Sequence, residues 1–155
     1  MRRVVTEEEL ASAFGRARWL AERQPTFLRA LGYFRKGLTT EDPLDQFFAY
    51  WRSLEIVADK YHPNTPGVPT GSKSHIWECF KKIWGPLSDW PRIAGQQLWI
   101  DENHALRIEI AHGTASVDVE AVERASEKAL VIRAVARGFL TDWWAKELAP
   151  GFALM

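Results

Sequence analysis

The chain has 155 residues, of which 46% are hydrophobic and 26% are charged, and its 20 basic and 20 acidic side chains leave no net charge. These values predict a single globular domain, residues 1–155, with enough chain for a hydrophobic core, and they give no overall signal for nucleic-acid binding. The lone cysteine, Cys79, excludes an intrachain disulfide, and no segment approaches the ~18 apolar residues of a membrane span, so we expect a cytoplasmic protein without membrane contact.

The first part of the chain is predicted to be helical. Thr6 followed by Glu9 has the spacing of a capping box, which predicts a helix start. Pro25 interrupts the apolar pattern, so the helix either kinks there or restarts at Thr26, with Pro25 outside its first turn, and continues to about Leu38. The next helix has the clearest amphipathic pattern in the chain, carried by Leu44, Phe47, Phe48, Trp51, Leu54 and Val57.

The middle of the chain combines a loop with two predicted helices. Residues 61–71 contain three prolines and two glycines, which predicts an exposed loop. A short helix is expected over Ser72–Trp84. Another is expected to start near Asp89 and to reach about His112, and Asn103–His104 could break it into two.

A long final helix is predicted after a capping serine, Ser116, and it is expected to run to about Leu148. Pro150 and Gly151 should stop it. The remaining tail, residues 150–155, is apolar for a terminus and would either pack back or dock on a partner. The whole pattern predicts an all-α, up-and-down bundle of about five helices.

The charges are unevenly distributed although they cancel overall. Residues 14–36 carry six basic side chains against one acid, and residues 101–125 carry six acids against two basic side chains. The two segments therefore have net charges of +5 and −4. Three interpretations stay open, namely phosphate binding, an electrostatic fit between subunits, or an ordinary solvated surface.

The stretch His104–Gly113 concentrates the chemistry of the chain. Arg107 is a fixed cation with a planar donor fork suited to phosphate, and His112 can exchange protons near neutral pH. On an ideal helix, residues five apart are rotated by about 140° and separated by about 7.5 Å along the axis, so the two do not share one face. Gly113 predicts that the helix stops at about His112, because glycine just past a helix end adopts the left-handed conformation.

Other catalytic patterns are weak or missing in the sequence. We find no Cys/His metal cluster and no phosphate-binding glycine loop, so we expect neither a metal nor a cofactor. His75 and Glu78 have a His-x-x-Glu spacing, but such a pair is far more often surface polarity than a metal site. Cys79 lies among apolar neighbours and is expected to be a small core residue.

The segment Leu106-Arg107-Ile-Glu-Ile-Ala-His112-Gly113 resembles the signature of the HEPN superfamily, in which four to six residues separate an arginine from a histidine. Its Ile-Ala-His-Gly ending is typical of the ApeA-like and methylamine-utilisation-associated branch. Upstream, residues 30–38, Asp42-Pro43 and residues 46–55 resemble the helix pair that precedes the signature in that branch. The resemblance covers about residues 28–140.

This resemblance implies an α-helical bundle that forms a homodimer with its two signatures facing each other. It also implies metal-independent cleavage of RNA, in which the RNA 2′-hydroxyl is the nucleophile. Carried over to this chain, His112 is the proton-transfer residue and Arg107 is the phosphate clamp. In a dimer, each Arg107 could work beside His112 of the partner subunit.

Two neighbours depart from the pattern of active members. The position after the arginine is usually polar, often asparagine, and here it is Ile108, which removes a hydrogen-bonding group. Glu109 puts an anion beside a phosphate site. We nevertheless expect Glu109 to contact substrate together with Glu55 and His104, although Glu55 could equally be a solvated residue at the edge of its helix.

Three functions remain compatible with the sequence. The first is a dimeric HEPN-like endoribonuclease in a defence or toxin role, controlled by a cognate antitoxin or regulatory protein. The second is an inactive HEPN-like module that binds RNA, a nucleotide or another protein. The third is a bundle whose tryptophans and apolar tail serve assembly only. The Arg107/His112 pair favours the first, whereas Ile108 and the zero net charge favour the other two.

Overall fold

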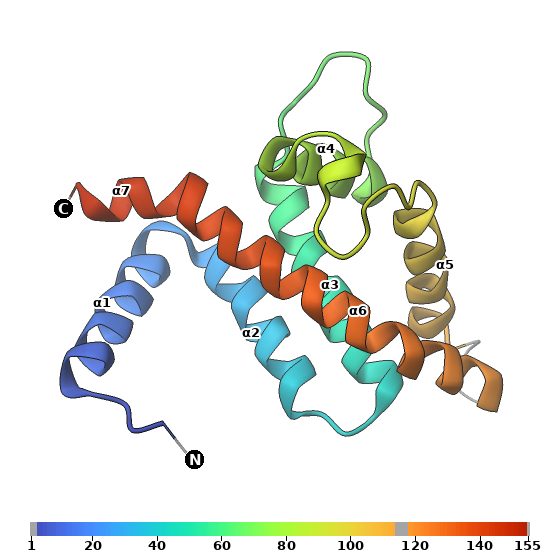
Figure 1. Cartoon of the computed structure of the whole chain (residues 1–155), viewed down its shortest axis with the longest axis horizontal. Coiled ribbons are helices and arrows are strands. Elements are labelled where there is room, and N and C mark those ends of the chain that lie inside the picture. The colour runs from blue at the N-terminus through green and yellow to red at the C-terminus, as the bar shows by residue number, and fades with distance from the viewer. Residues whose placement is uncertain (1–2, 114–117, 155) are drawn as a thin grey trace.

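The computed structural model describes residues 3–113 and 118–154, which form an all-helical domain without a strand (Figure 1). The helices are α1 (Glu7–Arg23), α2 (Pro25–Thr39), α3 (Pro43–Tyr61), α4 (Ser72–Trp84), α5 (Trp99–Ala111), α6 (Val119–Trp143) and α7 (Ala149–Ala153). The predicted all-helical class is therefore confirmed. Six of these helices have 13 to 25 residues, one more than the expected five, because residues 7–39 form two helices. No described helix has the length and hydrophobicity needed to cross a bilayer.

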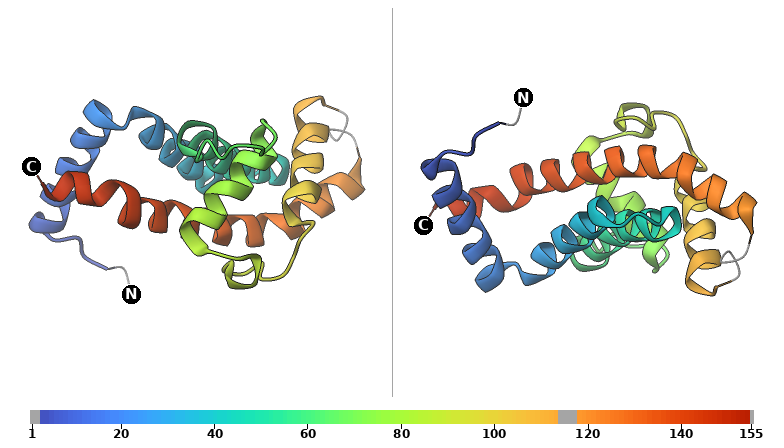
Figure 2. Two further views of the ribbon diagram at one scale, coloured as in Figure 1. Left: turned by 90° about the horizontal axis from the view of Figure 1, so that it is seen from above. Right: turned by 90° about the horizontal axis from the view of Figure 1, so that it is seen from below.

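Helices α3 and α6 form the centre of the bundle. α2 packs along α3, and α4 and α5 also pack against it. The continuous helical run from α6 to α7 spans the length of the molecule, with α1 and α7 at one end and α5 at the other (Figures 1 and 2). The buried apolar side chains of these helices form one cluster, with the fully buried Trp51 and Phe80 among its largest members. The end of the domain that carries α5 is thus well separated from the end that carries α1.

The break between α1 and α2 differs in detail from the expectation. Thr6 forms the predicted capping box with Glu9, which confirms the start of α1. Pro25 lies at the first position of α2 rather than outside its first turn. Proline is well suited to that position, because its nitrogen would have no intrahelical partner there and its φ angle is already helical.

No α-helix starts near Asp89, so the prediction of a helix from there to about His112 was wrong in its start. Residues 87–89 form a single 3₁₀ turn, irregular turns follow, and α5 begins only at Trp99. Nor does α5 break at Asn103–His104. The buried Asn103 amide donates a hydrogen bond to the Trp99 carbonyl at 2.7 Å, which satisfies it within the helix.

Pro150 and Gly151 do not stop the final helix, so this prediction was wrong. α6 passes into one π-helical segment, Trp144–Leu148, and then into α7, whose first turn contains Pro150. Proline costs no hydrogen bond at this position, because the backbone N–H groups in the first turn of a helix have no intrahelical acceptor. Phe152 packs on Trp19 and Trp144 with ring centroids 5.8 and 6.0 Å away, so the tail packs back on its own chain. Ser116, the predicted cap, lies outside the described residues, and Asp118 caps α6.

Two glycines of α2 allow a matched test of this packing. A Cβ atom at Gly37 would lie 2.6 Å from Cε1 of Tyr50, whose buried ring is tilted against Phe34, whereas a Cβ atom at Gly32 meets nothing within 4 Å. We expect Gly37→Ala to lower the free energy of unfolding by about 1–3 kcal/mol, because the ring must shift. Gly32→Ala should raise it by about 0.5–1 kcal/mol through better helix propensity. Urea unfolding of both variants checks this pair, and equal effects would contradict the close approach of α2 and α3.

Candidate functional site

Glu55 of α3 is the centre of the candidate site. Its side chain is only 1% exposed, so its interpretation as a solvated edge residue was wrong. Trp51 Nε1 donates to Glu55 Oε1 at 3.0 Å, and Arg52 Nη1 donates to Oε2 at 2.9 Å. A carboxylate this deeply buried is stable only when several donors replace its water.

Arg107 reaches the same carboxylate from α5. Its Nη2 donates to Glu55 Oε2 at 3.4 Å, and its Nε lies 3.2 Å from Oε1 without the alignment of a hydrogen bond. The guanidinium also lies over the Phe48 ring at 5.7 Å, a cation–π contact. This ion pair fixes α5 on α3. The Arg107 side chain is still 25% exposed, so part of the guanidinium remains open to solvent.

His104 lies one helical turn before Arg107 on α5. Its ring meets Trp51 edge-on, with centroids 6.3 Å apart. Burial lowers the pKa of His104 below its usual value, and the Glu55 carboxylate only partly opposes this effect. The neutral imidazole is therefore favoured near pH 7, which makes His104 a proton acceptor at the edge of the Glu55–Arg107 pair.

His112 lies at the end of α5 with an exposed side chain. Its backbone N–H donates to the Ile108 carbonyl at 3.0 Å, and Gly113 follows with a φ of +70°. The predicted end of the helix is thus confirmed. Within the described ranges, no hydrogen bond or ion pair joins the side chains of Arg107 and His112, in agreement with the geometry expected for residues five apart.

The two residues that depart from the resembled signature are Glu109 and Ile108. Glu109 Oε2 pairs with Arg124 Nη2 of α6 at 3.1 Å, so this acid links α5 to α6. Ile108 is 38% exposed. Glu109 and His104 thus contact different neighbours, and the structure brings together only Glu55, Arg107 and, through Trp51, His104. Substrate contacts by Glu55, Glu109 and His104 stay predictions.

Sequence reasoning missed Arg52. It lies three residues before Glu55, on the same side of α3, and its side chain is 31% exposed. The Glu55 carboxylate raises the pKa of the Arg52 guanidinium, chiefly through their hydrogen bond. The Arg-x-x-Glu spacing was visible in the sequence of α3, but only the burial of Glu55 gives it meaning. The site therefore has two guanidinium groups around one carboxylate, and these three groups together carry a charge of +1.

The other titratable residues considered in the sequence do not form a second site of this kind. His75 Nδ1 lies 2.9 Å from Asp59 Oδ1 and its ring stacks on His62, while Glu78 accepts a hydrogen bond from Thr65 at 3.0 Å. Over residues 3–113 and 118–154, no three His, Cys, Asp or Glu side chains converge as metal ligands would. Cys79 is buried as predicted, and burial raises its pKa to about 12, so its thiol is no nucleophile.

Comparison with known proteins adds no relative. No family model, curated protein or solved structure matches this chain.

Proposed function

We propose that this chain is a HEPN-like, metal-independent endoribonuclease that acts as a homodimer. The observation that carries the proposal is the buried Glu55, which holds Arg107 in a fixed direction while His112 stays exposed at the end of the same helix. A catalyst needs its charged group oriented before substrate arrives, because a flexible arginine would have to be ordered during the reaction. Glu55 has this positioning role, and Arg52 supplies a second guanidinium.

The proposed chemistry needs only these side chains and RNA. The 2′-hydroxyl oxygen attacks the adjacent phosphorus while His112 takes its proton. The bond from phosphorus to the 5′-oxygen breaks, and this oxygen takes up a proton from solvent. Arg107 stabilises the negative charge that builds on the phosphate oxygens. The products carry a 2′,3′-cyclic phosphate and a 5′-hydroxyl.

The proposed second subunit would account for the positions of the two residues. Arg107 faces α3, and His112 lies past the last turn of α5. The partner's His112 can approach Arg107 when two α5 helices face each other across a two-fold axis, which gives two equivalent composite sites. A cytoplasmic defence or toxin role with a cognate antitoxin or regulatory protein remains part of this proposal.

A second function is favoured by two specific observations. Ile108 places an apolar side chain, 38% exposed, directly after Arg107. Glu55 also neutralises part of the charge of Arg107 and so weakens its hold on a transition state. Both features fit an inactive HEPN-like module that binds RNA or a nucleotide phosphate through Arg52 and Arg107, or a protein through the same surface.

RNA cleavage in the presence of EDTA tests the proposed activity directly. Wild type should cleave a mixed RNA pool and leave 2′,3′-cyclic phosphate ends, which 3′-end chemistry of the products detects. Arg107→Ala and His112→Ala should each lower the rate at least about 100-fold, because each removes a group needed in the transition state. Arg29→Ala and His62→Ala, which change an arginine and a histidine outside the site, serve as controls and should keep the wild-type rate.

Mixing the two inactive variants tests the composite site. A heterodimer of Arg107→Ala and His112→Ala subunits contains one intact Arg107/His112 pair, so refolding both together should restore about one quarter of the activity by random pairing. No recovery from folded, mixed dimers would contradict a site shared between subunits. If wild type binds a fluorescent RNA oligonucleotide without cleaving it, and Arg52→Ala weakens that binding, the inactive module is correct instead.

A further inference from the structure

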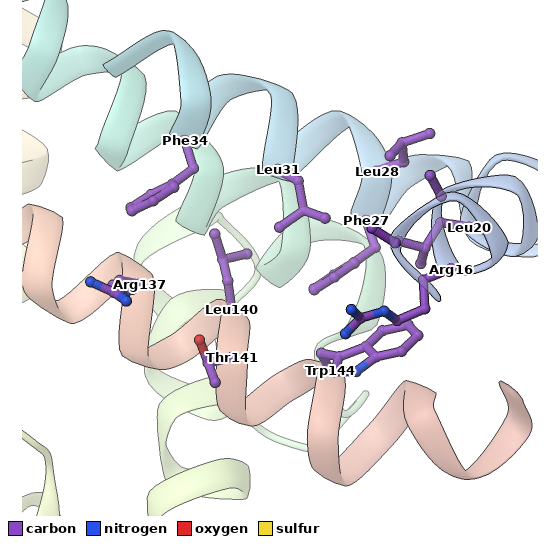
Figure 3. Close-up of a pocket in the computed structure, with 12 residues that line it drawn as sticks. Arg16, Leu20, Phe27, Leu28, Leu31, Phe34, Arg137, Leu140, Thr141 and Trp144 are labelled. Carbon is purple, nitrogen blue, oxygen red and sulfur yellow. The ribbon is translucent and has the colours of Figure 1, made fainter. Parts of the chain in front are cut away.

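We infer that a second site, at the opposite end of the domain from α5, binds an anionic amphiphile with a straight apolar chain, such as a medium-chain carboxylate. The site is a cavity of about 440 Å³ between α1, α2 and α6 (Figure 3). Small-molecule sites in proteins typically have about 300–1,000 Å³ and mostly apolar walls with few polar groups. The inference does not depend on RNA cleavage.

The cavity exists because α1 is held at only one of its ends. Trp19 and Leu20 are its buried residues, and Trp19 packs edge-on against Trp144 with centroids 5.9 Å apart. Earlier in α1, Phe14 remains 69% exposed. The ribbon accordingly diverges from α2 and α6 towards its N-terminal end (Figure 1). The apolar side of α1 therefore does not pack fully against α2 and α6, and it forms one wall of an open cavity between them.

The walls of the cavity are apolar along its length. Phe27 and Leu31 of α2 face Leu140 of α6 in Figure 3, and Leu20 closes one side. From Arg137 of α6 to Trp144 at the start of the π-helical segment, this wall spans about 10 Å, as seven residues of helix do. A straight hydrocarbon chain placed along this wall gains about 0.8 kcal/mol for each methylene group that leaves water.

Two arginines give the cavity its preference for an anion. Arg137 and Arg16 lie towards opposite ends in Figure 3. Within the described part of the chain, Arg137 makes no hydrogen bond or ion pair, and Arg16 has no carboxylate partner, since its only bond runs from Nε to the Ser12 carbonyl at 3.4 Å. Arg16 belongs to residues 14–36, which carry a net charge of +5, and Arg137 of α6 faces this segment.

This charge complementarity selects one chemical class of ligand. A carboxylate head can take two parallel N–H donors from either guanidinium while its chain covers the apolar walls. A neutral alcohol of the same length would form no ion pair with the arginines, which are both exposed, and a cationic amphiphile would be repelled. The structure therefore points to an amphiphilic anion rather than to any apolar molecule.

The test uses sodium decanoate below its micellar concentration, and binding is followed by calorimetry and by the change in tryptophan fluorescence, to which Trp144 in the cavity wall contributes. We expect saturable binding of one decanoate per chain. Decanol should bind more weakly, and decyltrimethylammonium should not bind. Arg16→Gln combined with Arg137→Gln should weaken decanoate binding about tenfold or more, since charge-assisted hydrogen bonds are lost.

Two further variants keep the test independent of folding. Leu31→Trp fills the cavity and should abolish decanoate binding, whereas Arg29→Gln removes a nearby exposed guanidinium outside the cavity and should leave it unchanged. Each variant must unfold cooperatively in urea, which shows that the domain is folded before decanoate is added. Equal binding of decanoate and decyltrimethylammonium, or no saturable binding, would overturn the inference. The inference would also be overturned if the cavity is filled by a second copy of the chain. In that case the wild type would be a dimer through this face, and the Phe14→Glu variant would be a monomer.

Discussion

Phe80→Ala should lower the free energy of unfolding by about 3–5 kcal/mol, a large part of the 5–15 kcal/mol typical of a domain. Phe80 of α4 is fully buried, and its ring contacts Trp84, Trp90 and Phe139 at centroid distances of 4.7, 5.2 and 5.1 Å. Truncation leaves a cavity between α4 and α6 that these large, stiff rings cannot fill. Urea or thermal unfolding, followed by circular dichroism, measures the loss.

Phe14→Ala is the matched control, because the same side chain is removed from a position that is 69% exposed. The change should alter the free energy of unfolding by less than about 0.5 kcal/mol. A small effect of Phe80→Ala, comparable to that of Phe14→Ala, would contradict the packing of α4 on the centre of the bundle.

Glu55→Gln should lower the free energy of unfolding by about 2–4 kcal/mol and abolish RNA cleavage. The substitution keeps the size of the side chain but removes the charge that Arg52 and Arg107 share. Breaking a fully buried ion pair costs about 3–5 kcal/mol, and the partial exposure of both arginines reduces this value. Urea unfolding gives the stability, and the EDTA cleavage assay gives the activity.

The control for Glu55→Gln is Glu22→Gln, which removes the same charge from the exposed Arg18–Glu22 pair of α1. Its effect should stay below about 0.5 kcal/mol, as is usual for exposed pairs four residues apart on a helix. If Glu55→Gln is as mild as this control and leaves cleavage intact, Glu55 neither holds α5 on α3 nor positions Arg107.

Most helices could be predicted from the sequence because their signals are local. The capping box at Thr6 and the apolar spacing of α3 act within a few residues, so they depend little on the rest of the fold. The error at Pro150 occurred where a tertiary contact overrides such signals. Pro150 is accommodated after a π-helical segment while Phe152 packs on Trp19, a residue of the distant α1.

The candidate site divides in the same way. Arg107, His112 and the glycine that ends their helix could be singled out in the sequence, because they lie within one short segment. The sequence could not show that Glu55 is buried or that Arg52 joins it, since that depends on how α3 and α5 pack, with Glu55 and Arg107 52 residues apart in the chain. The cavity between α1, α2 and α6 likewise depends on where α1 docks. Local patterns determine which segments are helical and where they end, whereas the burial of a charge or the opening of a cavity is decided only when distant helices pack together.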